Sequence, residues 1–101
     1  TANLPPFSRF VAMIISGTDK RETESHAQAL KKTAPKAAEI FLLGPAEAPM
    51  ALVRGRFRYR LLVHAPRSFD VQAYIKDWLQ AAPRERGGIR VQIDVDPQSF
   101  L

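Results

Sequence analysis

Four arginines recur at every second position of one short stretch, in the pattern Arg54-x-Arg56-x-Arg58-x-Arg60. Residues that alternate in this way leave a β-strand on the same face. A guanidinium group keeps its charge and binds phosphate oxygens through two parallel hydrogen bonds. The chemistry that this pattern favours is therefore the binding of a polyanion through a row of phosphate contacts.

The residues between these arginines are apolar, so residues 54–64 are predicted to form one strand with a buried face and a cationic face. Its buried set is Phe57, Tyr59, Leu61 and Val63. An alternative is that the arginines pair with carboxylates and only solvate an edge of the protein. The candidate carboxylates for that alternative are Glu85, Asp94 and Asp96.

The composition bounds the function. A chain of 101 residues with 46% hydrophobic and 25% charged residues has the makeup of one globular domain, which we expect to span residues 1–101. The net charge of +5 favours an anionic partner such as nucleic acid. No apolar run in the sequence is long enough to span a membrane, and no signal-peptide pattern is present. The cytoplasm is the expected compartment.

Catalytic and metal-binding motifs are missing from the sequence. The chain has no cysteine, which excludes disulfides and thiolate metal sites. His26 and His64 lie far apart in the sequence, and neither is assigned a catalytic role. Asp94 and Asp96 have no evident third ligand for Mg²⁺. Because there is also no phosphate-binding glycine loop and no nucleophile motif, we expect no enzymatic activity, metal or cofactor in these residues.

Four strands and two helices must position the arginines. Residues 10–16 are continuously apolar, which predicts a strand buried on both faces. A helix is predicted from a cap at Asp19, with Glu22 three residues on, to about Thr33. Residues 40–45 predict a short strand that Gly-Pro interrupts, and residues 46–53 predict a loop or irregular edge.

The second helix is the most clearly amphipathic segment. Ser68 is its predicted N-cap, and its apolar stripe is expected to face the core. The stripe consists of Val71, Tyr74, Ile75, Trp78, Leu79 and Ala82. Residues 89–95 then alternate as a last strand.

The order of elements is β-α-β-β-α-β. At this size the order predicts an α+β fold, the ferredoxin-like split sandwich, with a four-stranded antiparallel sheet and both helices on one face. The first and third strands are expected in the middle of the sheet. The open face would carry Arg58 and Arg60, and Met13 or Ile15 would join them. The candidate DNA-binding residues are Arg54, Arg56, Arg58, Arg60 and Arg90.

Several segments together resemble a known family. They are Leu4-Pro5-Pro6-Phe7-Ser8-Arg9, Leu43-Gly44-Pro45-Ala46, the arginine stretch from Arg54 to Arg60, and Val91-x-x-Asp94-Val95-Asp96-Pro97. In this order and spacing they resemble the C-terminal domain of the primosomal replication-restart helicases (primosomal protein N′, PriA). The resemblance covers essentially the whole chain.

The resemblance implies a piece of a bacterial, ATP-dependent 3′→5′ DNA helicase that assembles the primosome at stalled forks. The ATP, Mg²⁺ and zinc sites of such helicases lie upstream of this domain. It also implies a fold similar to that of a small-subunit ribosomal protein, and binding to forked or single-stranded DNA. A pocket for the tail of single-stranded DNA-binding protein would use Arg67 and Gln72.

Two hypotheses remain open. In the first, the arginine-rich strand grips DNA phosphates. In the second, the domain mainly docks protein, either the helicase core, other primosome proteins or the acidic tail of single-stranded DNA-binding protein.

Overall fold

The structure is a computed structural model that describes residues 8–95. Six elements follow one another in the predicted order: β1 (Ser8–Gly17), α1 (Lys20–Lys32), β2 (Phe41–Val53), β3 (Arg56–Pro66), α2 (Val71–Ala81) and β4 (Arg90–Val95). Neither helix has the length and hydrophobicity that crossing a bilayer requires.

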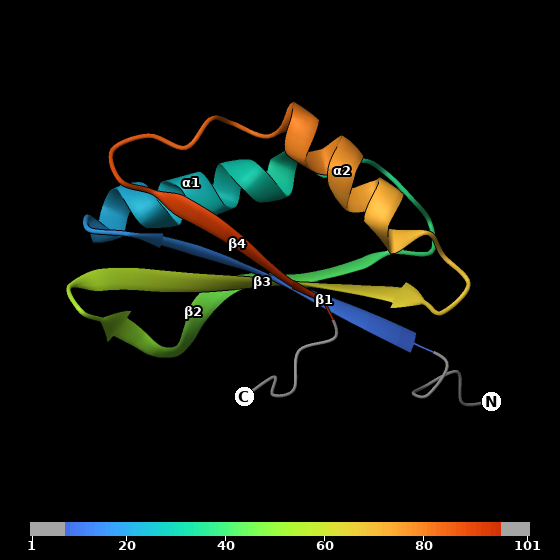
Figure 1. Cartoon of the computed structure of the whole chain (residues 1–101), viewed down its shortest axis with the longest axis horizontal. Helices are drawn as coiled ribbons and strands as arrows, with labels where there is room; N and C mark the ends of the chain where they lie inside the picture. Colours follow the sequence, from blue (N-terminus) through green and yellow to red (C-terminus); the bar gives the residue numbers. More distant parts are fainter. Residues whose placement is uncertain (1–7, 96–101) are drawn as a thin grey trace.

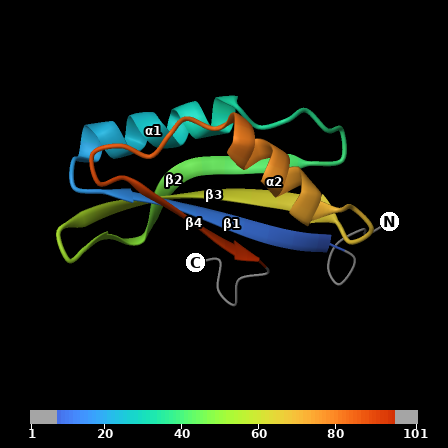
Figure 2. The ribbon, with the colours of Figure 1, turned by 45° about the horizontal axis from the view of Figure 1, so that its top comes forward.

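The four strands form one antiparallel sheet in the order β2-β3-β1-β4 (Figure 1). Both helices lie on the same face of this sheet, as the turned view shows (Figure 2). The ferredoxin-like split sandwich is thereby confirmed, and so is the central position of the first and third strands. The opposite face of the sheet is left without a covering element among the described residues.

The core lies between the sheet and the helices. Tyr59, Leu61 and Val63 of β3 are buried, as their alternation predicts. The indole of Trp78 is fully buried, and its Nε1 donates a 2.8 Å hydrogen bond to the carbonyl oxygen of Leu30. This bond ties α2 to the last turn of α1, so the two helices are held as one layer over the sheet.

The helix starts follow the sequence in one case and differ in the other. The Asp19 carboxylate accepts a 2.8 Å hydrogen bond from the amide of Glu22, which confirms the predicted cap of α1. The cap of α2 is Asp70, which accepts from Ala73, so the prediction of Ser68 was wrong. The reason is a turn that the amide of Phe69 closes onto the carbonyl of Pro66, which delays the helix by two residues.

Of the two alternatives predicted for residues 46–53, the structure shows the irregular edge and not the loop, because β2 continues to Val53 at the edge of the sheet with shifted register. The strand tolerates Gly44-Pro45 for two reasons. First, β2 is an edge strand, so the proline, which has no amide hydrogen, need not donate to a neighbouring strand. Second, the register of β2 to β3 shifts twice, as in a β-bulge. Gly44 has φ +104° and lies against the Arg60 carbonyl, 2.7 Å from where a Cβ would stand. Only glycine fits this position.

Arg54 is not part of the arginine strand. Arg54 and Gly55 form the two-residue turn of the β2–β3 hairpin, with φ of 53° and 77°, and the strand begins at Arg56. Two positive φ values match the right-handed twist of the strands that such a turn joins. The predicted alternation therefore holds from Arg56 onward.

Two further predictions about faces were wrong. Met13 and Ile15 are fully buried under the helices, because Met13 pairs across the strands with Leu61 and Ile93 on the core face. Their neighbour Ile14, opposite Arg60, lies on the open face instead. Leu79 remains 43% exposed, because Trp78, one residue earlier and about 100° around the helix, takes the inward position.

Candidate nucleic-acid interface

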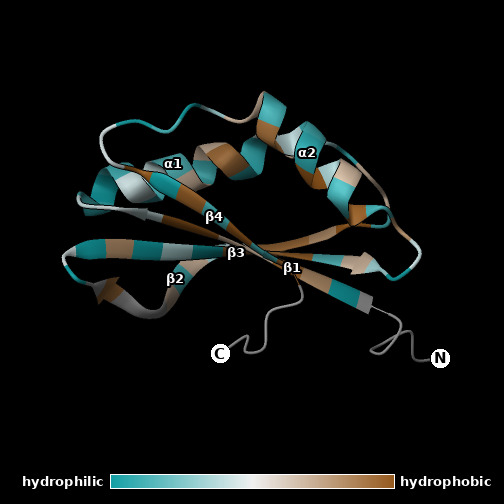
Figure 3. Ribbon diagram, in the orientation of Figure 1, coloured by the Kyte–Doolittle hydropathy of each residue, from teal (hydrophilic) through white to brown (hydrophobic). Residues whose placement is uncertain are grey.

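The open face of the sheet gathers cationic side chains from two strands. Arg58 of β3 and Arg90 of β4 both pair with Ser16, from opposite sides of β1. Neighbouring strands lie about 4.8 Å apart, so the two arginines leave the sheet roughly 10 Å from each other. Arg60 follows two residues along β3 on the same face, opposite Ile14. Figure 3 shows the alternation of polar and apolar residues along this part of β3.

Arg56 has a different environment. Its Nη2 donates hydrogen bonds to the carbonyl and hydroxyl oxygens of Ser16, at 3.1 and 3.2 Å, and to the carbonyl of Gly88. The guanidinium group thus joins the end of β1 to the segment that leads into β4. Arg56 therefore stabilises the arrangement of β1, β3 and β4, the strands beside or on which Arg58 and Arg90 lie.

The alternative in which the arginines pair with carboxylates does not hold for Arg54, Arg58 or Arg90 among the described residues. Within residues 8–95, no carboxylate makes an ion pair with the side chains of Arg54, Arg58 or Arg90. Glu85 instead accepts a 3.2 Å hydrogen bond from the amide of Val91. Asp96 lies outside the described residues. These cations are therefore available to an external anion.

The opposite end of the open face is aromatic. The rings of Phe10 and His64, which face each other across β1 and β3, are stacked with centroids 4.7 Å apart and planes 9° apart. Phe41 of β2 flanks His64 from the other side at 6.2 Å. Phe41 is 62% exposed and Leu43, its neighbour on the same face, is 54% exposed. An aromatic patch of two half-buried rings, Phe10 and His64, and one exposed ring, Phe41, thus continues the face that carries the arginines.

Sequence reasoning missed this aromatic patch. Phe10 belongs to an apolar run that reads as buried on both faces, and Phe41 belongs to a short apolar strand. The signal that identifies the patch is the cross-strand register, in which Phe10 and Phe41 both pair with His64. That register depends on strand order and cannot be read along one strand.

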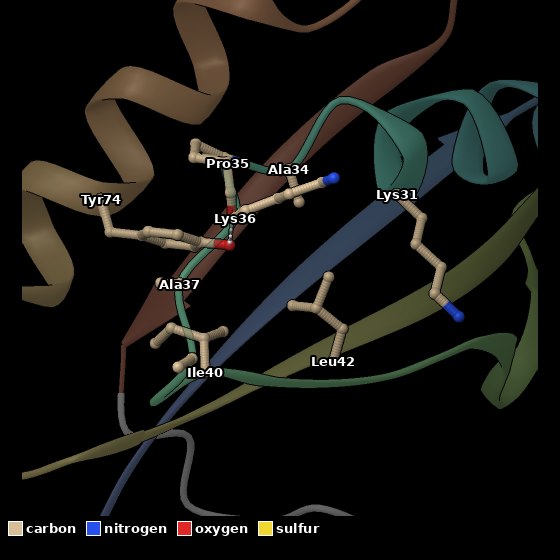
Figure 4. A pocket seen from close by; sticks show the side chains of 9 residues that line it. Lys31, Ala34, Pro35, Lys36, Ala37, Ile40, Leu42 and Tyr74 are labelled. Carbon is tan, nitrogen blue, oxygen red and sulfur yellow. Dashed lines mark hydrogen bonds between the residues drawn. The ribbon is translucent and has the colours of Figure 1, made fainter.

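A hollow of about 410 Å³ opens between the α1–β2 segment and α2 (Figure 4). Its floor is apolar, with Ile40 and Leu42, and Lys31 and Lys36 lie at its rim. The hydroxyl of Tyr74 donates a 2.7 Å hydrogen bond to the Pro35 carbonyl and so holds one wall. Burial raises the pKa of the Tyr74 phenol, which keeps it protonated as a donor. The hollow suits an apolar group next to an acidic one.

Arg67 and Gln72 do not line this hollow. Arg67 is exposed in the turn after β3, and Gln72 is exposed in the first turn of α2. The two residues therefore belong to one end of the molecule, next to the Asp70 cap.

A second hollow, of about 710 Å³, lies between α1 and the segment before β4. Arg21, Arg84 and Arg86 contribute to its walls, together with His26. Burial lowers the pKa of His26, and the nearby charge of Glu85 offsets part of that shift. No cluster of three or more potential metal ligands occurs in residues 8–95.

Comparison with known proteins identifies the family. The model of the primosomal protein N C-terminal domain matches residues 1–98. The chain belongs to this family. The family's C-terminal domain is non-catalytic, which confirms the expectation that this chain is not itself an enzyme.

Similarity to individual proteins supports this family membership. The chain is 37% identical to the Replication restart protein PriA of Rickettsia felis over 100 residues, which are 99% of this chain and 15% of that protein. It is 34% identical to the Replication restart protein PriA of Synechocystis, over 97% of this chain and 12% of the relative. The chain thus spans about 15% or less of the length of the relatives named here.

Proposed function

We propose that this chain is the DNA-binding C-terminal domain of a larger helicase that acts in replication restart. The observation that carries the proposal is the open sheet face, where Arg58 and Arg90 flank β1 without a carboxylate partner in residues 8–95. Phosphate contacts from such a surface supply affinity without reading sequence. The longer relatives named for replication restart give the context in which a fork-binding domain acts.

The arginines divide into two groups in this proposal. Arg58, Arg60 and Arg90 contact phosphates from the open face, and Arg54 reaches the same strand of DNA from the hairpin turn. Arg56 acts indirectly, because its hydrogen bonds to Ser16 and Gly88 hold β1 and the segment before β4 in place beside β3. In this proposal ATP, Mg²⁺ and zinc bind elsewhere in the larger protein, and the domain acts together with the motor in the bacterial cytoplasm.

Salt dependence tests the proposal. Fluorescence-anisotropy titrations of forked, single-stranded and duplex DNA would be run from about 50 mM salt upward. We expect log affinity to fall linearly with log salt, and Arg58→Ala or Arg90→Ala each to reduce the slope for single strands by about 0.7. Leu79→Ala, on the helix side, is the control. Absence of binding at about 50 mM salt would contradict the proposal.

Protein docking is the second candidate function, and the hollow of Figure 4 favours it. An acidic tail with an apolar side chain, such as that of single-stranded DNA-binding protein, would place a carboxylate near Lys36 and its side chain on Ile40. The resemblance instead points to Arg67 and Gln72 for the same tail. Lys36→Glu and Arg67→Glu, compared in a binding titration with an acidic peptide, separate the two positions.

A further inference from the structure

We infer that the aromatic patch of Phe10, His64 and the exposed Phe41 is a base-stacking site, so that the open face binds single-stranded DNA in preference to duplex DNA. This inference rests on the proposed function, because the phosphates of the same strand must meet the arginines. It adds the part of the nucleic acid that is contacted and the form of DNA that is preferred.

The position of the patch relative to the arginines supports this inference. Arg58, Arg60 and His64 all lie on the open face of β3, because they are separated by two and four residues along one strand. With a rise of about 3.3 Å per residue, His64 stands roughly 13 Å from Arg60 and 20 Å from Arg58. A single strand that lies along β3 therefore meets cations at one end of the face and aromatic rings at the other.

The geometry of the rings also suits stacking. His64 is held between Phe10 and Phe41, with ring planes 9° and 32° apart. Phe41 forms the outer member of this row and leaves 62% of its surface in water. A flat base can cover that surface, because every base presents a π-face to an aromatic ring. Leu43, 54% exposed beside it, extends the apolar contact to a neighbouring base or sugar.

The occupant follows from the combination of aromatic and cationic groups on one face. RNA-recognition modules use a four-stranded sheet whose open-face aromatics stack two or three bases. Bases in a duplex are already stacked on each other and cannot reach Phe41. A protein partner would cover the apolar patch equally well, but it would not require arginines on the same strand.

The test compares nucleic acids that differ only in their bases. A labelled oligothymidylate of about 12 nucleotides and an abasic strand with the same number of phosphates are titrated against the chain. We expect the base-containing strand to bind at least about fivefold more tightly than the abasic one. Phe41→Ala should remove most of that difference while leaving abasic binding unchanged. Phe41→Leu, which keeps an apolar side chain, should also lose the preference.

Control measurements separate failure of this inference from failure of the proposed function. Leu79→Ala, an exposed leucine on the helix side, should bind both strands as the unmodified chain does. Phe41→Ala should leave the salt slope unchanged, whereas Arg58→Ala should lower it by about 0.7. Equal binding of base-containing and abasic strands, with the arginine effect intact, overturns stacking alone. Loss of the arginine effect overturns the proposed function, and stacking falls with it.

Discussion

Replacing Arg56 by alanine should destabilise the fold more than it weakens the contact with DNA. One nitrogen, Nη2, lies within 3.2 Å of three acceptors on Ser16 and Gly88. Because it carries two protons, at most two strong hydrogen bonds form at once. Hydrogen bonds from a charged donor contribute about 1.5–3 kcal/mol each when buried. Here the donor is half-exposed and water can replace it, so we expect a total loss of about 2 kcal/mol.

Thermal and urea unfolding measure this loss. In a chain of this size about 2 kcal/mol corresponds to a fall in melting temperature of roughly 8–16 °C. Arg58→Ala is the matched control, since its side chain has no hydrogen bond or ion pair with another described residue, and it should stay within about 0.5 kcal/mol of the unmodified chain. Arg56→Lys keeps the charge but not the planar group, so it should lose stability and keep the salt slope. If the Arg56→Ala and Arg58→Ala variants had the same melting temperature, the structural role of Arg56 would be refuted.

Three further outcomes follow from single residues. Arg54→Asn should raise the free energy of unfolding by about 0.5–1 kcal/mol in urea, because asparagine tolerates the positive φ of the hairpin turn; a loss of stability would contradict this. Trp78→Phe should lower the free energy of unfolding by about 2 kcal/mol, because it removes indole volume and the hydrogen bond to Leu30. An unchanged melting temperature would contradict the role of this hydrogen bond in holding α2 to α1. The pKa of His26 is lowered by burial, so the unfolded chain binds more protons below its ordinary value of 6.5. Stability should therefore fall as pH drops from 7 toward 5 by more than in His26→Gln, and parallel pH profiles would argue against burial of the imidazole.

The alternation of apolar residues was sufficient to predict which face of β3 is buried. Tyr59, Leu61 and Val63 face the helices, because a period of two leaves only one choice of face once the core is apolar. The same pattern could not locate the start of the strand, since Arg54 continues the alternation of charges although its φ is positive. Turn geometry at Arg54-Gly55, which the residue pattern does not encode, decided that boundary.

The role of individual arginines could not be predicted from their spacing. Arg56 and Arg58 are equivalent in the sequence pattern, yet only Arg56 meets backbone acceptors, and these lie 40 and 32 residues away at Ser16 and Gly88. Long-range contacts of this kind appear only when the strands are placed side by side. The same holds for the aromatic row, in which β2 and β1 bring Phe41 and Phe10 to His64.

Mapping of amide chemical shifts by NMR, with the chain titrated with single-stranded DNA, tests most directly which surface binds. The expected result is a set of changes along the open face, at Ser16, Arg58, Arg60 and Arg90, that extends to His64 and Phe41. Changes confined to residues 34–40 and the start of α2, with the sheet unaffected, would contradict a nucleic-acid interface on the open face.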